Sequence, residues 1–169
     1  YPAGVGWLAV KWTVPESWPR ALAAAAGWPL AEWARSVVFT GFPWLSLGYA
    51  ALPGESVSPW SGYAPVGGVF MVTLAIALAA AALALMVAAI AAAERARAVV
   101  LAGAIAALAA GGAALGRIEW TSPVGAPVSV SLVQGNVTQE LKFDPDLRRT
   151  TFDLYAGLVS ASHGRLVVL

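Results

Sequence analysis

Long apolar runs, rather than alternating polar and apolar positions, make up the first two thirds of the chain. Residues 65–93 contain no charged side chain, residues 98–116 form a shorter Ala-rich run, and residues 19–39 form a run interrupted by Gly27 and Pro29. A run of about 20 apolar residues can cross ~30 Å of hydrocarbon as a helix. The pattern predicts about three transmembrane helices, with a kink or restart at Pro29 in the first.

The segments around these runs have the composition of membrane interfaces. Residues 1–19 carry three tryptophans among few charges, and tryptophan gathers at the level of the lipid headgroups. Residues 40–63 are rich in Pro, Gly and aromatic side chains, with Glu55 as the only charge. This composition argues against a continuous helix and predicts a loop near the membrane surface. The charged stretch 94–97 predicts a tight turn between the second and third spans.

Beyond residue 121 the apolar period becomes that of a strand. Apolar residues at every second position of Val128–Val133 predict a strand with one buried face, which ends at Gln134–Asn136. Asp144, followed by proline, predicts the N-cap of a helix that closes at a C-cap glycine, Gly164. Residues 165–169 predict a second strand. Strand, helix and strand in this order predict a parallel βαβ unit.

These patterns divide the chain into two expected domains. A transmembrane helical region is expected over residues 1–121, and the beginning of an α/β domain over residues 122–169. The chain starts with Tyr1 rather than Met and ends within an apolar strand, so we expect it to be an internal piece of a larger protein.

The composition supports a membrane protein and excludes several other classes. Apolar residues make up 59% of the 169 residues and charged residues 11%, far from the average of soluble domains. The net charge of +1 and the lack of a basic stripe argue against a nucleic-acid partner. Without cysteine the chain has no disulfide and no thiolate metal site, and His163 is expected to be a surface residue. We expect neither a metal nor another cofactor.

The distribution of positive charge predicts the orientation in the membrane. Lys11 and Arg20 precede or begin the first run, and Arg95 and Arg97 lie between the second and third runs, whereas residues 40–63 contain no Lys or Arg. Positively charged loops face the cytoplasm. The loop 40–63 and the C-terminal domain are therefore expected on the opposite, extracytoplasmic side.

Two charged residues lie one helical turn apart within the first run, Glu32 and Arg35. Charged groups inside a span are costly and usually pair, so we favour an ion pair that helps to hold the following loop. In the alternative, Arg35 binds a lipid phosphate. Gly112 and Gly116 match the small-residue packing motif, for which packing within the helix bundle is favoured over dimerisation.

Two motifs resemble apolipoprotein N-acyltransferases. VSLVQGNVTQELKFDP at residues 130–145 resembles the start of the nitrilase-like domain of this family. TGFPWLSLGYA at residues 40–50 resembles a second family signature in the membrane part. Both occur in the family's order, with two spans between them. The resemblance implies a multi-span protein of the bacterial inner membrane, whose nitrilase-like domain lies on the periplasmic side.

The resemblance also implies an activity. Members transfer an acyl chain from a phospholipid, through a thioester on a cysteine, to the N-terminal amino group of a diacylglyceryl-cysteine lipoprotein. They use a Glu-Lys-Cys triad, of which the Glu is expected just after Leu169 and the Lys and Cys further on. No catalytic residue is therefore expected in this chain, which should be inactive alone, while the full-length protein is expected to be a monomer.

The same resemblance suggests residues that contact substrate. In TGFPWLSLGYA, Phe42, Pro43 and Trp44 are expected to form the wall of a groove that admits lipid, although they could equally form an aromatic belt with a turn. The residues at the end of the first strand are expected to shape the floor of the active site. At the position where the family usually has Trp, Phe143 keeps an apolar ring but lacks the indole N–H. The candidates are Arg35, Phe42, Pro43, Trp44, Gln134, Gly135, Asn136 and Phe143.

Two other functions compete with the enzyme fragment. A non-catalytic, membrane-anchored module would present a small extracytoplasmic domain to a partner. A transporter would carry polar residues in the middle of the second and third spans, where there are almost none.

Overall fold

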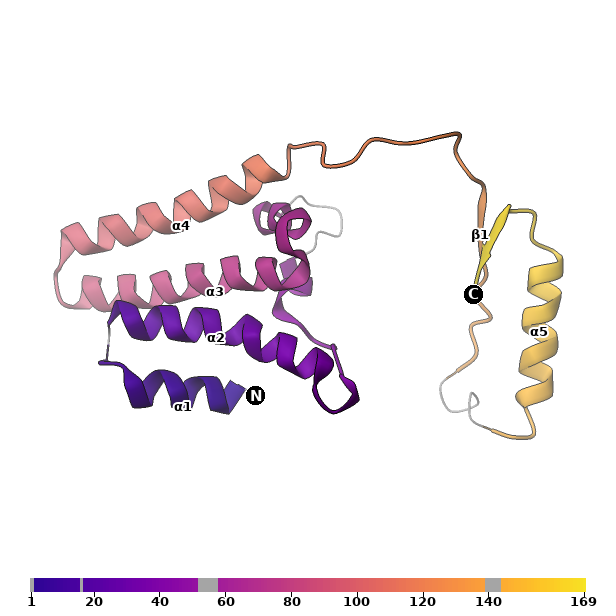
Figure 1. Cartoon of the computed structure of the whole chain (residues 1–169), viewed down its shortest axis with the longest axis horizontal. Helices are drawn as coiled ribbons and strands as arrows, with labels where there is room; N and C mark the ends of the chain where they lie inside the picture. Colours follow the sequence, from indigo (N-terminus) through magenta and orange to yellow (C-terminus); the bar gives the residue numbers. More distant parts are fainter. Residues whose placement is uncertain (1, 16, 52–57, 139–143) are drawn as a thin grey trace. The chain divides into compact units, whose positions relative to one another are not determined.

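The computed structural model describes residues 2–15, 17–51, 58–138 and 144–169, and it divides into two compact units, Tyr1–Thr121 and Ser122–Leu169 (Figure 1). The α-helices of the first unit are α1 (Pro2–Trp12), α2 (Trp18–Val37), α3 (Ala64–Ala91) and α4 (Arg95–Leu115). Its 3-10 helices are η1 (Val38–Thr40), η2 (Leu47–Ala51) and η3 (Pro59–Tyr63). The second unit contains β1 (Val130–Leu132), α5 (Arg148–Ser160) and β2 (Leu166–Val168).

In the first unit, helices that are neighbours in the sequence lie side by side: α1 on α2, α2 on α3 and α3 on α4 (Figure 1). The buried centre between α3 and α4 is formed by small and aliphatic residues, Ala82, Leu85, Ala89 and Leu101. Alanine at such positions lets two helix backbones approach closely. Close packing of this kind holds helices together where the hydrophobic effect does not drive their association. The Ala-rich composition of the two apolar runs therefore serves the packing of the helix pair.

Two helices among the described residues are long and apolar enough to cross a membrane, Pro59–Ala91 and Arg95–Leu115. They correspond to the second and third predicted spans. The first predicted span is also a helix, because α2 is continuous for 20 residues with Pro29 inside it. It does not restart at Pro29, and it carries three charged residues, Arg20, Glu32 and Arg35. That α2, α3 and α4 cross a membrane stays a prediction.

The N-terminal segment contains a helix that the sequence pattern did not predict. The helix α1 packs on α2 where Gly27 leaves room, since a Cβ atom there would lie 2.9 Å from Cγ1 of Val5. One turn apart on α1, the Lys11 ammonium lies 4.4 Å from the centre of the Trp7 ring, a cation–π contact. The aromatic and charged residues that suggested an interface are thus carried on a helix.

The two long helices contain one break and meet in one tight turn. Gly67 and Gly68 have non-helical backbone angles within α3, and Gly68 has φ +62°. Between α3 and α4, Ala93 adopts φ +59° and closes the turn. Of the charged stretch 94–97 that was expected to form the turn, only Glu94 lies between the two helices. Arg97 instead lies in the first turn of α4, where its Nη1 is 2.9 Å from Oε2 of Glu94.

The second unit has the predicted order strand, helix, strand. β1 and β2 pair in parallel, with Val130 opposite Leu166 and Leu132 opposite Val168. The expected burial of the apolar face of β1 is wrong for this structure: Val130 is 50% exposed and Leu132 81%. The alternation is that of a strand with one apolar face, but no described element covers that face.

Two predicted helix caps in this unit are also wrong. Oδ1 of Asp144 accepts the N–H of Asp146 at 2.9 Å in a turn, and α5 begins only at Arg148, without a side-chain cap. Asp favours both geometries, because each uses a short bond from its side chain to a nearby N–H group. The C-cap of α5 is Ala161 rather than Gly164. Gly164 instead donates its N–H to Oγ of Ser131 at 2.9 Å.

Candidate functional site

The motif TGFPWLSLGYA begins at the end of η1, turns sharply at Gly41 and continues into η2. We call residues 41–46 the aromatic loop. Its rings, Phe42 and Trp44, stack with their centres 5.8 Å apart and their planes 12° apart, and they are 65% and 67% exposed. The turn into the loop uses positive φ at Gly41, +75°, where a side chain would collide with the carbonyl oxygen of Ser36. The backbone therefore presents the ring pair outward from the helices.

The loop is bonded to the helices on both sides of the ring pair. Before the rings, the N–H of Phe42 donates to the carbonyl of Arg35 at 2.9 Å. After them, the N–H of Leu47 donates to Oε1 of Glu32 at 2.8 Å, and the N–H of Gly48 donates to Oγ1 of Thr73 at 2.9 Å. α2 and α3 thus supply the acceptors that hold this segment.

The Glu32 carboxylate is the centre of this network. It is 7% exposed and accepts from Trp28 Nε1 at 3.1 Å as well as from Leu47. Its second oxygen, Oε2, accepts from the hydroxyl of Thr73 at 2.8 Å, and Thr73 is fully buried. Buried charge is costly unless it is hydrogen-bonded, and here three donors surround the carboxylate.

The expected ion pair between Glu32 and Arg35 is not formed in the described part of the chain. The three donors to Glu32 come from Trp28, Leu47 and Thr73, and Nε and Nη2 of Arg35 are buried without a hydrogen-bond partner there. The carboxylate has nearer partners on η2 and α3 than on its own helix. Glu32 still holds the following loop, as expected, but through N–H and O–H donors rather than through Arg35.

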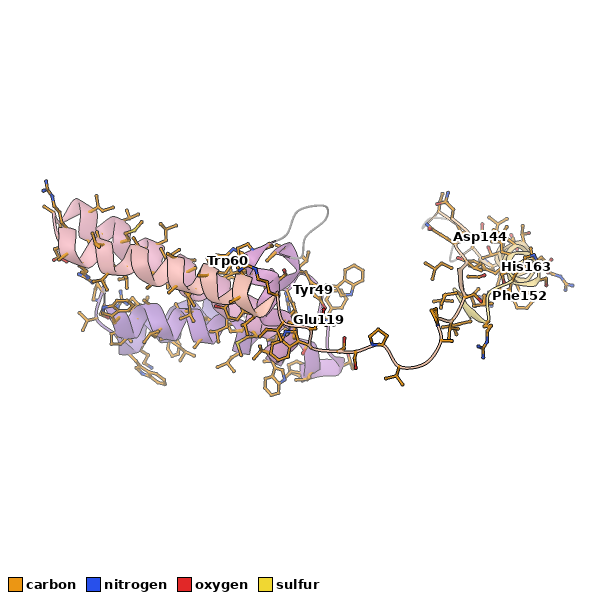
Figure 2. All side chains as sticks on the ribbon, turned by 90° about the horizontal axis from the view of Figure 1, so that it is seen from above. Tyr49, Trp60, Glu119, Asp144, Phe152 and His163 are labelled. Carbon is orange, nitrogen blue, oxygen red and sulfur yellow. The ribbon has the colours of Figure 1, made fainter. Side chains whose placement is uncertain are left out.

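A second close contact joins η3 to α4 through glycines. A Cβ atom on Gly112 would collide with the carbonyl oxygen of Pro59 and would lie 2.8 Å from Cε2 of Tyr63. The hydroxyl of Tyr63 donates to the carbonyl of Leu108 at 2.7 Å. The small-residue motif of α4 therefore serves packing within the unit. Tyr49, Trp60 and Glu119 lie at the same end of this unit (Figure 2).

An apolar groove of about 380 Å³ lies between α2 and α3. It is lined by residues of both helices: Ala26, Pro29, Leu30, Trp33, Gly67, Phe70, Met71 and Leu74. Its lining belongs to the helices rather than to the aromatic loop. The prediction that Phe42, Pro43 and Trp44 border a groove that admits lipid stays a prediction.

In the second unit, Gln134–Asn136 follow the carboxyl end of β1, as the turn residues predicted. Asn136 adopts φ +49°, a backbone angle that asparagine tolerates. Gly135 lies against α5, since a Cβ atom there would come within 2.7 Å of the Tyr155 ring. The neighbouring Val133 donates its N–H to the carbonyl of Val168 at 2.8 Å, so this corner lies beside the end of β2. Ligands of parallel sheets bind at the carboxyl ends of strands.

The remaining candidates carry less structural information. Phe143 lies outside the described residues. His163 is exposed, as expected, and within the described part of the chain no group of acidic, His or Cys residues could hold a metal ion. Sequence reasoning missed Thr73, which joins α3 to η2. The available signal was its position as the one polar residue in the apolar run 65–93.

Comparison with known proteins agrees with the motifs. Residues 1–82 match the apolipoprotein N-acyltransferase N-terminal domain. A curated apolipoprotein N-acyltransferase of Nitrosomonas europaea is 40% identical over 168 residues, which cover 99% of this chain and 32% of that protein. One from Chromobacterium violaceum is 41% identical over 170 residues, covering 100% of this chain and 31% of that protein.

The similarity extends over both units of the chain. A further relative of that name, from Ralstonia nicotianae, is 44% identical over 155 residues, or 88% of this chain and 26% of that protein. The chain thus spans about a third of the length of the curated relatives it matches. The motif loop, the helices that hold it and the strand-end corner of the second unit all fall within this similarity. Along its whole length the chain is therefore similar to apolipoprotein N-acyltransferases.

Proposed function

We propose that this chain is the part of an apolipoprotein N-acyltransferase that connects its membrane helices to its catalytic domain. The observation that carries the proposal is the identity of about 40% with curated relatives of that name across 99% of the chain. The helical unit and the strand–helix–strand unit are both included. Each motif by itself would indicate only one of the two units, whereas the similarity over the whole chain includes both.

In this proposal the full-length protein takes an acyl chain from a phospholipid and passes it to a lipoprotein. A cysteine thiolate attacks the ester carbonyl of the phospholipid and forms a thioester, with lysophospholipid as the leaving group. The N-terminal amino group of a diacylglyceryl-cysteine lipoprotein then attacks the thioester and releases the thiolate. The Glu and Lys of the triad would act as general base and as stabiliser of the oxyanion.

Within this reaction the described residues bind and position rather than react. The chain contains no cysteine, so it cannot itself hold the thioester. The corner Gln134–Asn136 lies beside the end of β2, where the resemblance places the catalytic Glu just after Leu169. The exposed ring pair Phe42 and Trp44 would face phospholipid on the periplasmic side of the bacterial inner membrane, which is also the side expected for the second unit. In this arrangement α2, α3 and α4 all cross the membrane, and the full-length protein acts as a monomer.

The proposal is tested with the full-length protein purified in detergent and a fluorescent phosphatidylethanolamine as donor. We expect the full-length protein to form a hydroxylamine-sensitive acyl-enzyme and to label a diacylglyceryl-cysteine peptide. The 169-residue chain alone serves as a control and should form no acyl-enzyme. Failure of the full-length protein to form a thioester would contradict the proposal and would favour a membrane-anchored interaction module.

A further inference from the structure

The segment that follows the aromatic loop is fixed by side chains that are distant in sequence. Leu47 and Gly48 are consecutive, and their N–H groups reach Glu32 on α2 and Thr73 on α3. The two acceptors are themselves bonded, Thr73 Oγ1 to Glu32 Oε2 at 2.8 Å. One buried carboxylate therefore joins the start of η2 to two helices at once.

The backbone of η2 also lies directly against α3 at Gly48. A Cβ atom on Gly48 would collide with the carbonyl oxygen of Val69 and would lie 2.8 Å from Cγ2 of that residue. Ser46 and Gly48 are both buried, although Leu45 beside them is almost fully exposed. The exposed ring pair is thus followed directly by a backbone that is seated between helices.

The two ends of the loop are held differently. The bond from Phe42 to Arg35 is local and uses a backbone carbonyl at the end of α2. The bonds at Leu47 and Gly48 depend on the Glu32 and Thr73 side chains, and a buried N–H group that loses its acceptor costs more free energy than an ordinary hydrogen bond contributes. Removal of the carboxylate should therefore release the C-terminal end of the aromatic loop while its N-terminal end stays bonded.

We propose that Glu32 is a positioning residue, whose carboxylate fixes the start of η2 and thereby holds Phe42 and Trp44 in the geometry that receives the phospholipid. The fixing of η2 follows from the contacts above, whereas the role toward phospholipid rests on the proposed function. Glu32 does not touch the reacting atoms. It acts through the loop, and Thr73 relays the same carboxylate to Gly48.

The first test measures hydrogen exchange at individual amides in the full-length protein, by mass spectrometry with electron-transfer fragmentation. In Glu32→Leu we expect exchange at Leu47 to become about 10- to 100-fold faster, because its N–H loses a charged acceptor. In Thr73→Val the acceleration should fall on Gly48 and not on Leu47. Exchange within α3 and α4 should remain as in the parent protein in both variants.

Conservative variants show whether the acceptor itself is responsible. Glu32→Gln keeps an oxygen for Leu47 and Trp28 and turns its amide toward Thr73, whose oxygen has a free lone pair, so exchange should stay near the parent value. Thr73→Ser should restore slow exchange at Gly48. Trp28→Phe is the matched control, since it removes a donor to the same carboxylate but leaves the acceptor of Leu47 in place, and it should leave exchange at Leu47 unchanged. Unchanged exchange at Leu47 in Glu32→Leu, or an equal rise throughout α2 and α3, overturns the positioning role.

The second test asks what the fixed loop does. In Glu32→Leu the KM for phosphatidylethanolamine in acyl-enzyme formation should rise about 10-fold while kcat changes less than about 3-fold, since the missing interaction acts on binding. Glu32→Gln should restore the KM. A fall of kcat by about 10-fold at constant KM overturns the role in receiving phospholipid. If the parent protein forms no acyl-enzyme, the proposed function fails, and the exchange test still decides the role of Glu32 in fixing η2.

Discussion

The contact between η3 and α4 allows a sharp test of the packing, because the same substitution can be made twice on one helix. Gly112 and Gly103 both lie within α4, and Gly→Ala in a helix interior stabilises the helix by about 0.5–1 kcal/mol. At Gly103 nothing lies within 4 Å of the added methyl group. Gly103→Ala should therefore raise the free energy of unfolding by about that amount.

At Gly112 the same methyl group has no space. It would collide with the carbonyl oxygen of Pro59 and lie 2.8 Å from Cε2 of Tyr63, and that ring is held by its bond to Leu108. Overpacking of a closed contact costs about 1–3 kcal/mol. After the gain in helix propensity, the net loss in Gly112→Ala should be about 0–2.5 kcal/mol, which places this variant about 1–3 kcal/mol below Gly103→Ala.

The difference between the two variants isolates the steric cost, because the propensity gain is common to both. Unfolding of the full-length protein in mixed detergent micelles, followed by tryptophan fluorescence, gives both free energies under one condition. A Gly112→Ala variant that is as stable as Gly103→Ala would show that η3 does not pack on α4 as described.

Two further predictions concern the membrane topology and the helix core. In a full-length protein without native cysteines, Leu45→Cys should react with an impermeant maleimide in intact spheroplasts, and Ala96→Cys should react only after lysis. The reason is that the loop 40–63, which lacks positive charge, is expected outside. The reverse pattern would refute the orientation. Leu101 is fully buried between α3 and α4, so Leu101→Ala should lower the free energy of unfolding by about 2–5 kcal/mol in the same micelle assay, against Val99→Ala on the exposed face as control. Equal losses in both variants would show that Leu101 is not at the centre of the packing.

The elements that the sequence predicted well are those set by local patterns. The uncharged runs became α3 and α4, and the order of strand, helix and strand was correct with a parallel pairing. The length and composition of an apolar run decide where the long helices form, and the order strand, helix, strand restricts the pairing of the two strands to the parallel arrangement. The helix α1 was missed because its tryptophans and charges indicated an interface but not a backbone conformation.

The errors arose where a side chain could choose among partners. Arg35 is one turn from Glu32 and looked like its partner, yet the carboxylate bonds to Leu47 and Thr73, 15 and 41 residues away. Such contacts depend on how α2 and α3 pack, which no local pattern reports. Asp144 was misassigned for a different reason, because turn and cap use the same kind of bond. The end of the first strand at Gln134–Asn136 was predicted correctly, because asparagine is one of the few residues that tolerate the positive φ found at Asn136.

The broken turn at Gly67 and Gly68 has a consequence for depth in the bilayer. Hydrocarbon offers no partner to the N–H and C=O groups that a broken helix leaves unpaired, so such a break is tolerated only where protein, water or headgroups reach it. The regular helix beyond it, from Val69 to Ala91, is ~35 Å long at about 1.5 Å per residue, close to the thickness of the apolar layer. As a membrane-spanning helix, α3 would place the glycine pair at the membrane interface, with Trp60 near the headgroups and residues 69–91 within the hydrocarbon.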